Sequence, residues 1–229
     1  MRKSAIFLLF VAFCLTILGL SAQGGIAVPP QTARTKTEAE GKQKPEDSKQ
    51  RPVAKSKVYL LHSDLLRKDA THPDAQIVTG NVRFRHDSVY MYCDSACYYD
   101  KVSSFEAFGN VKMVQGDTLF LYGDRLYYDG LTQIAEMRCN VRMENRTTTL
   151  LTDSLNYDRV YNLGYFFDGG TLMDEQNVLT SEWGEYSPQT KQSVFNYNVK
   201  LVNPQFTLTS DTLRYNTASK IADIVGPSD

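Results

Sequence analysis

Two sequence landmarks recur in this chain every 29 or 30 residues, and this internal repeat restricts the fold more than any other feature. The first landmark is an Asn-Val pair, replaced once by Gly-Gly: Asn81-Val82, Asn110-Val111, Asn140-Val141, Gly169-Gly170 and Asn198-Val199. The second is an acidic residue, found at Asp64, Asp94, Asp124, Asp153, Glu182 and Asp211. From the second acid onward a tyrosine follows four residues later, at Tyr98, Tyr128, Tyr157, Tyr186 and Tyr215. Two landmarks that keep one period indicate an array of similar structural units.

Within each unit apolar and polar residues alternate, as they do around Leu119 and Leu121. Alternation of period two is typical of a β-strand with one buried face. Each unit also carries two turn clusters, for example Gln115-Gly116-Asp117 and Asp129-Gly130. Two turns per unit predict an all-β, antiparallel repeat meander. A parallel β-helix, which needs no hairpin turns, is the alternative.

Each predicted strand has a break in this alternation near its middle. Leu121 and Leu126 flank Asp124 at an interval of five residues, so a regular strand would place them on opposite faces. A bulge or corner at the acid brings both inside, and glycines such as Gly80 and Gly109 let the partner strand bend. We therefore expect a sheet folded lengthwise into a V-shaped β-jellyroll. The corner carboxylates, expected to accept hydrogen bonds from free backbone amides, are Asp94, Asp124, Asp153 and Asp211.

The N-terminal quarter of the chain has a different composition. Residues 1–22 are typical of an export signal, because Arg2 and Lys3 precede an apolar run and small residues end it, with cleavage expected near Ala22. An uncleaved membrane anchor is the alternative. Residues 23–57 carry no aromatic side chain and are rich in Lys, Gln, Pro, Thr and Glu, which predicts a disordered linker. The predicted folded domain is 58–229.

The charge and the cysteines of that domain exclude several functions. It holds fifteen Lys and Arg against twenty-two Asp and Glu, and an acidic surface argues against nucleic acid as a partner. The sequence has no CxxC pair and no His/Cys cluster, so neither a metal nor another cofactor is expected. Cys93 and Cys97 could form a disulfide only across a sharp bend, and unpaired thiols at these positions and at Cys139 are the alternative.

The repeated register is similar to that of a known family. A Gly-Asn-Val triplet, a short turn, a Leu-x-x-Asp-x-Leu-x-Tyr-Asp strand and a further Asn-Val pair resemble the OstA-like family of LptA- and LptC-type lipopolysaccharide-transport proteins, on residues Gly109-Asn110-Val111, Leu121, Asp124, Leu126, Tyr128-Asp129 and Asn140-Val141. The resemblance implies an antiparallel β-jellyroll that shields lipid acyl chains in the periplasm and bridges the inner and outer membranes. It leaves open whether the chain is a soluble bridge or an anchored component.

The resemblance also implies partners. Lipopolysaccharide is the implied ligand, and copies of the chain or other OstA-like components are implied to associate end to end. The unpaired first strand around 58–61 and the last around 220–225 are the edges expected to pair. The apolar side chains expected to face inward and contact lipid are Leu119, Leu121, Met143, Leu150, Leu179, Leu201 and Leu208.

An enzyme is disfavoured, because catalytic acids occur once or twice in a site, whereas these acids recur in every unit. No catalytic residue is therefore expected. The second functional hypothesis is an exported structural or adhesive repeat protein, in which the same apolar interior is a closed core. The two hypotheses differ in the size of the interior, which is an open cleft in the first and a filled core in the second. The residue composition does not give this size.

Overall fold

The computed structural model describes residues 56–69 and 72–228, all within one unit, Arg51–Asp229. The expected signal, 1–22, lies outside the described residues, as does the expected linker, 23–57, apart from its last two residues. No helix in the described part of the chain is long and apolar enough to span a membrane.

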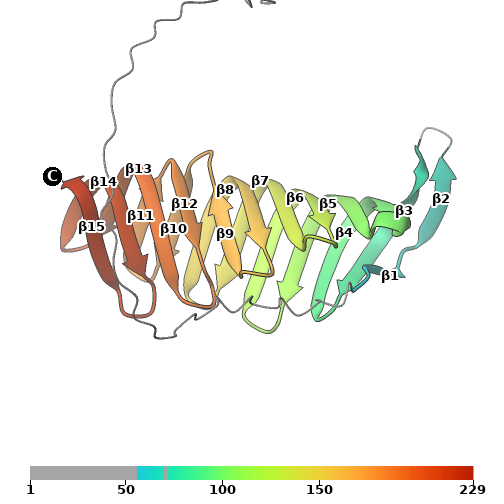
Figure 1. Ribbon diagram of the computed structural model, residues 1–229, viewed down its shortest axis with the longest axis horizontal. Coiled ribbons are helices and arrows are strands. Elements are labelled where there is room, and N and C mark those ends of the chain that lie inside the picture. Colours follow the sequence, from blue (N-terminus) through green and yellow to red (C-terminus); the bar gives the residue numbers. More distant parts are fainter. Residues whose placement is uncertain (1–55, 70–71, 229) are drawn as a thin grey trace, which may run out of the picture. The chain divides into compact units, whose positions relative to one another are not determined.

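The described residues form one antiparallel sheet of fifteen strands, with a single 3-10 turn, η1 (Asp100–Val102). Except at the first strand and in the middle of the sheet, neighbouring strands are joined by short turns and follow one another in chain order, as Figure 1 shows. Every strand pair is antiparallel, which confirms the predicted all-β meander, and the parallel β-helix alternative is wrong. The strands are β1 (Tyr59–His62), β2 (Leu65–Asp69), β3 (His72–His86), β4 (Val89–Tyr99), β5 (Ser104–Gln115), β6 (Leu119–Asp129), β7 (Ile134–Asn145), β8 (Thr148–Asp158), β9 (Leu163–Phe166), β10 (Gly170–Asp174), β11 (Asn177–Ser181), β12 (Trp183–Tyr186), β13 (Gln192–Asn203), β14 (Phe206–Asn216) and β15 (Ile221–Ser228).

A bulge crosses the sheet at the repeated acids and folds it lengthwise. Between β5 and β6, Phe108 pairs with Arg125 and Val111 pairs with Gly123, so two residues of β5 stand opposite Asp124 alone. The same register shift recurs in β3, β7 and β13. We call this row of bulges the fold line. It is the corner that the broken alternation predicts.

Two successive residues at each bulge have positive φ. In β5 they are Gly109, with φ of 73°, and Asn110, with φ of 44°. Glycine lacks the Cβ that disfavours this region, and asparagine tolerates it better than most residues. The Gly-Asn pair of the repeat therefore supplies the two residues that adopt positive φ at the bulge. In β7 and β13 the glycine position is instead Cys139, with φ of 63°, and Tyr197, with φ of 65°.

Replacing Cys139 by glycine is expected to stabilise the protein by about 0.5 to 1 kcal/mol, because relief of the left-handed conformation outweighs the added entropy of the unfolded chain. Urea denaturation monitored by circular dichroism measures the difference. The matched control is Cys97→Gly, inside β4 with ordinary strand pairing, which is expected to destabilise by a similar amount. Destabilisation by Cys139→Gly would contradict this account of the bulge.

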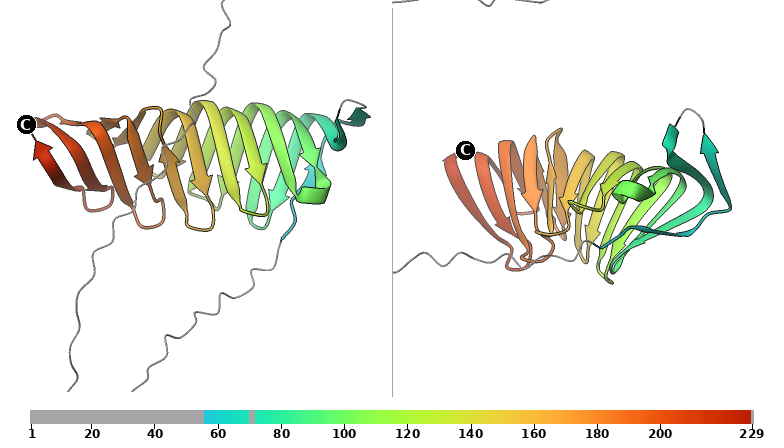
Figure 2. Two further views of the ribbon diagram at one scale, coloured as in Figure 1. Left: turned by 45° about the horizontal axis from the view of Figure 1, so that its top comes forward. Right: turned by 45° about the vertical axis from the view of Figure 1, so that its right-hand side comes forward.

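The fold line divides the sheet into two layers that can be followed in Figure 2. Wall A contains the strand segments around 82–92, 111–123, 141–152, 170–181 and 199–210. Wall B contains the segments around 74–79, 95–108, 125–138, 154–166, 183–196 and 212–225. Their inner faces share one apolar core, and the rings of Phe84 in wall A and Phe105 in wall B stack with centroids 4.1 Å apart.

The regular meander is interrupted in the middle of the sheet. The strand after β8 is split into β9 and β10, and the next strand is split into β11 and β12, so each half pairs within its own wall. Phe166 is fully buried at this break. A Cβ at Gly170 or Gly184 would lie 2.6 Å from its ring, so the two glycines make the space that the ring fills.

Candidate functional site: the interior and its mouth

The structure places the seven expected lipid-facing residues on the inner face of wall A. Six of them are no more than 4% exposed, and Leu208 is partly buried against the same core. On the opposite face, Arg142 and Lys200 are exposed and Lys112 is half-buried, in agreement with the strand alternation. The six buried residues are Leu119, Leu121, Met143, Leu150, Leu179 and Leu201. The interior is thus a row of apolar side chains that is closed to water in this conformation.

The four expected corner acids all lie exposed on the fold line, but their hydrogen-bond partners differ from the prediction. The carboxylate of Asp94 accepts a hydrogen bond from the side-chain amide of Asn110 at 2.8 Å, and Asp124 accepts one from Asn140 at 2.6 Å. Only Asp153 accepts from a backbone amide, that of Asn140, at 3.4 Å. The fourth acid, Asp211, stands at the last bulge. At Asp94 and Asp124 the acid of one unit accepts a hydrogen bond from the asparagine of the next unit. This contact explains why the two sequence landmarks share one period.

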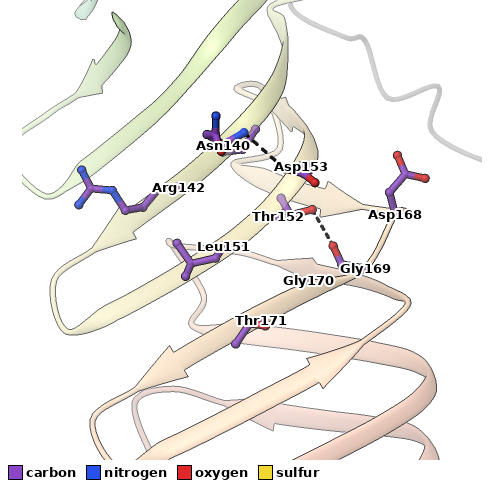
Figure 3. A pocket seen from close by; sticks show the side chains of 10 residues that line it. Asn140, Arg142, Leu151, Thr152, Asp153, Asp168, Gly169, Gly170 and Thr171 are labelled. Atoms are coloured by element: carbon purple, nitrogen blue, oxygen red, sulfur yellow. Dashed lines mark hydrogen bonds between the residues drawn. The ribbon is translucent and has the colours of Figure 1, made fainter.

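A hollow of about 520 Å³ lies on the outer surface at the interrupted repeat, and Figure 3 shows its lining. Gly169 stands where other units have the fold-line asparagine, and its carbonyl accepts a hydrogen bond from the Thr152 hydroxyl at 2.7 Å. Asp153 and Asp168 line the same hollow. Among the described residues, no group of three or more His, Cys, Asp or Glu side chains is arranged to hold a metal ion.

The two walls also approach each other on the side opposite the fold line, which we call the mouth. The repeated tyrosines of wall B are at most 4% exposed, and their hydroxyls point to polar residues. The last four of them, Tyr128 to Tyr215, face the last residues of wall A strands: His86, Gln115, Asn145 and Asp174, which are themselves 29 or 30 residues apart. The hydroxyl of the first, Tyr98, donates instead to the Val58 carbonyl at 2.7 Å. We call each tyrosine and its polar neighbours a latch.

Four latches recur along the mouth. In the first, the Tyr128 hydroxyl lies 2.6 Å from Nδ1 of His86. In the second, Asn162 Oδ1 accepts hydrogen bonds from Gln115 at 2.8 Å and from the Tyr157 hydroxyl at 3.3 Å.

In the third latch, the Tyr186 hydroxyl donates to Asn145 Oδ1 at 3.4 Å, and in the fourth the Tyr215 hydroxyl donates to Asp174 Oδ2 at 2.8 Å. Residues from wall B turns complete these contacts, because Lys191 donates to Asn145 and Lys220 donates to Asp174. Across the described part of the mouth, the hydrogen bonds that join the walls are all made by side chains.

Burial keeps the latch groups in definite protonation states. It raises the pKa of Tyr128 and of Tyr157 to about 12, so both phenols are neutral at physiological pH. Burial and the nearby Arg159 guanidinium lower the pKa of His86 below 6.5, while Asp87 and the backbone of Ser56 oppose this shift. The first latch therefore contains a neutral imidazole.

The lowered pKa of His86 predicts a loss of stability in mild acid. Above pH 6.5 the ring is neutral in both the folded and the unfolded chain. Below pH 6.5 the unfolded chain binds a proton that the folded chain does not, so the free energy of unfolding falls by up to about 1.4 kcal/mol per pH unit until the folded pKa is reached. Urea titrations between pH 7.5 and 5.5 measure this slope. His86→Asn should flatten it.

Together, these features define an antiparallel β-jellyroll repeat protein with an enclosed apolar interior, a continuous fold line and a latched mouth. The chain belongs to the family described as OstA-like protein, whose sequence profile matches residues 55–211. This membership confirms the resemblance seen in the repeats.

Among solved structures, the chain is similar to LptH from Pseudomonas aeruginosa, described as the LptA-homologous periplasmic component of the conserved lipopolysaccharide transport device. The two are 13% identical, with a TM-score of 0.44, over 48% of this chain and 82% of LptH. No curated protein sequence matches the chain.

Proposed function

We propose that this chain is a non-enzymatic, periplasmic protein that binds lipopolysaccharide and helps to carry it between the inner and outer membranes, with the acyl chains held between wall A and wall B. Membership of the OstA-like family supports the proposal. The observation that carries it is the construction of the interior: an apolar core shared by two walls, with covalent backbone at the fold line and side-chain hydrogen bonds at the mouth.

The energies involved are compatible with an interior that opens. The net contribution of one hydrogen bond to the free energy of folding is about 0.5 to 1.5 kcal/mol, so a single latch is weak. Each methylene group transferred from water to an apolar surface contributes about 0.8 kcal/mol. A few methylene groups of an acyl chain therefore offset one latch, and a longer chain offsets the loss of packing between the walls. No covalent step is needed, because the proposed work is transfer of an unchanged lipid.

A second candidate is an exported structural or adhesive protein whose core stays closed. The stacked rings of Phe84 and Phe105 favour it, because side chains of opposite walls interlock across the interior at the N-terminal end. A Cβ at Gly164 of wall B would lie 3.2 Å from Sδ of Met143 in wall A, so the walls are also close near the centre. In this conformation the interior holds no lipid-sized space along these contacts.

Site-specific photo-crosslinking separates the two candidates. A photoreactive amino acid is placed singly at Leu121, Met143, Leu150 or Leu201, in cells that make lipopolysaccharide. The outward controls are Lys112 and Lys200 on the same wall. The transport proposal expects lipopolysaccharide adducts at the inward positions and none at the controls. A folded, expressed protein that gives no inward adduct would favour the closed core.

We further propose that the chain associates end to end with copies of itself or with other OstA-like components. The last strand, β15, pairs only with β14, and its Ile221, Ile224 and Val225 are 58%, 41% and 43% exposed. At the other end, Tyr59 and Leu61 of β1 are about half exposed. Cross-linking from both edges, with sedimentation of the purified protein, tests this pairing.

Export is also part of the proposal, and it rests on the signal-like residues 1–22. The intact mass of the protein recovered from the periplasm tests cleavage near Ala22. A membrane-bound product that retains these residues would support the anchored form.

A further inference from the structure

The first latch contains buried hydrogen-bond donors that have no acceptor. Among the described residues, five buried side-chain polar atoms make no hydrogen bond, and three of them belong to neighbouring residues at this latch: His86 Nε2, Arg159 Nε and Ser56 Oγ. The backbone of Ser56 contacts the His86 ring, and Arg159 Nη1 lies 3.0 Å from His86 Nδ1. Buried polar groups without partners are rare in proteins, and a bound ion or water molecule is one physical explanation for them.

The contacts determine which nitrogen of His86 carries the proton. A guanidinium group can only donate, so its contact with Nδ1 requires a lone pair on that nitrogen. The ring proton is then on Nε2, which makes no full hydrogen bond, although the Ser56 backbone and the Asp87 carboxylate approach the ring, and it lies beside Nε of Arg159. The His86 side chain is fully buried and that of Arg159 is 6% exposed.

The hydrogen bonds of Arg159 go to neutral acceptors: His86 Nδ1, the Tyr128 hydroxyl and, at 3.4 Å, the His86 carbonyl oxygen. The carboxylate that comes nearest is that of Asp87, at 3.9 Å from Nη2, and the same carboxylate is 3.7 Å from Nε2 of His86. Both distances exceed a hydrogen bond. In the fourth latch, by contrast, the cation Lys220 donates to the buried carboxylate of Asp174 at 2.6 Å. A buried cation is stable only when an anion or several hydrogen bonds compensate it.

We propose that His86, Arg159 and Ser56 form a binding site for an anionic oxygen group, a phosphate monoester or a carboxylate, carried on the headgroup of a lipid whose chains enter the interior at this mouth. The lipid part of this inference rests on the proposed function, whereas the anion part does not. Two N–H donors and a hydroxyl group match the several acceptor oxygens of such a group. Arginine suits the role because its charge persists at every physiological pH.

Asp87 competes with the ligand at this site. Its carboxylate is 45% exposed and approaches the same two donors without reaching hydrogen-bond distance, so it can turn away into solvent when an anion binds. Removing its charge should therefore strengthen anion binding. Asp87→Asn tests the site without taking any cation out of the fold.

Binding is measured by titration calorimetry on the full chain with three probes: inorganic phosphate, dodecyl phosphate and dodecyl maltoside, each amphiphile below its micelle concentration. Dodecyl phosphate is expected to bind about 10- to 100-fold more tightly than dodecyl maltoside, the range expected for charge-assisted hydrogen bonds. Arg159→Gln should abolish this preference. Asp87→Asn should increase it several-fold, and Arg214→Gln, an exposed arginine of β14, should not alter it.

The outcomes separate the two proposals. Equal binding of both amphiphiles to the unaltered chain would overturn the headgroup site and leave the lipid interior intact. Binding of inorganic phosphate that Arg159→Gln removes, with no binding of either amphiphile, would support a free-phosphate site and count against the proposed function. If Arg159→Gln does not fold, Asp87→Asn decides, since an unchanged preference in that variant overturns the site.

Discussion

Replacing Phe166 by alanine is expected to lower the free energy of unfolding by about 3 to 5 kcal/mol, the range for a fully buried phenylalanine. The cavity has little means of collapsing, because Gly170 and Gly184 have no side chains to move into it. The loss should also appear as local opening, since Phe166 packs where both flanking strands are split. Urea denaturation gives the magnitude, and hydrogen exchange gives the location.

Phe167→Ala is the matched control for this substitution. Phe167 is 46% exposed and its ring lies 5.7 Å from the Arg138 guanidinium, so its loss should cost less than about 1 kcal/mol. A second variant, Phe166→Ala with Gly170→Ala, should recover part of the lost stability by filling the space. Equal effects at 166 and 167 would mean that Phe166 does not hold the interrupted repeat together.

Asp174→Ala is expected to lower the free energy of unfolding by about 3 to 5 kcal/mol, because it removes the buried carboxylate of an ion pair and leaves its cation without a partner. The Asp174 carboxylate is fully buried and accepts hydrogen bonds from Tyr215 at 2.8 Å and from Lys220 at 2.6 Å. Without it, the Tyr215 hydroxyl keeps only its contact with Asn177. Thermal and urea denaturation measure the change.

The adjacent acid provides the control. Glu175 also contacts Lys220, at 3.2 Å, but its side chain is 58% exposed, so Glu175→Ala should cost no more than about 1 kcal/mol. Asp174→Asn keeps an acceptor for Tyr215 and should fall between the two. If Asp174→Ala is as mild as Glu175→Ala, the fourth latch does not contribute to stability as the structure indicates.

The architecture could be predicted from the sequence because its signals are local. Strand alternation, paired turns and the five-residue interval between Leu121 and Leu126 each follow from backbone geometry, and together they locate the bulge at Asp124. The role of the asparagine after Gly109 was not predicted. Its positive φ and its hydrogen bond to Asp94 depend on the exact pairing register of β4 and β5 at the bulge, which the repeat pattern alone does not determine.

The latches could not be predicted, because their members are 41 or 42 residues apart and meet only when the walls close. A signal for them does exist, since His86, Gln115, Asn145 and Asp174 keep the repeat spacing. Their residue types differ, and Asn145 alone is indistinguishable from an ordinary turn residue. Whether the interior is filled was also beyond the sequence, because the stacking of Phe84 on Phe105 is a property of the assembled walls.

The latches have a mechanical consequence. The fold line is continuous backbone in most strands and resists separation along its whole length, whereas the mouth is closed by four separate contacts of different chemistry. No latch shares a hydrogen-bonding side chain with the next, so we expect the latches to open one at a time and not together as one hinge. A lipid chain that moves lengthwise through the interior, as we propose, would then need only the latch beside it to be open. The other latches could stay closed during its passage.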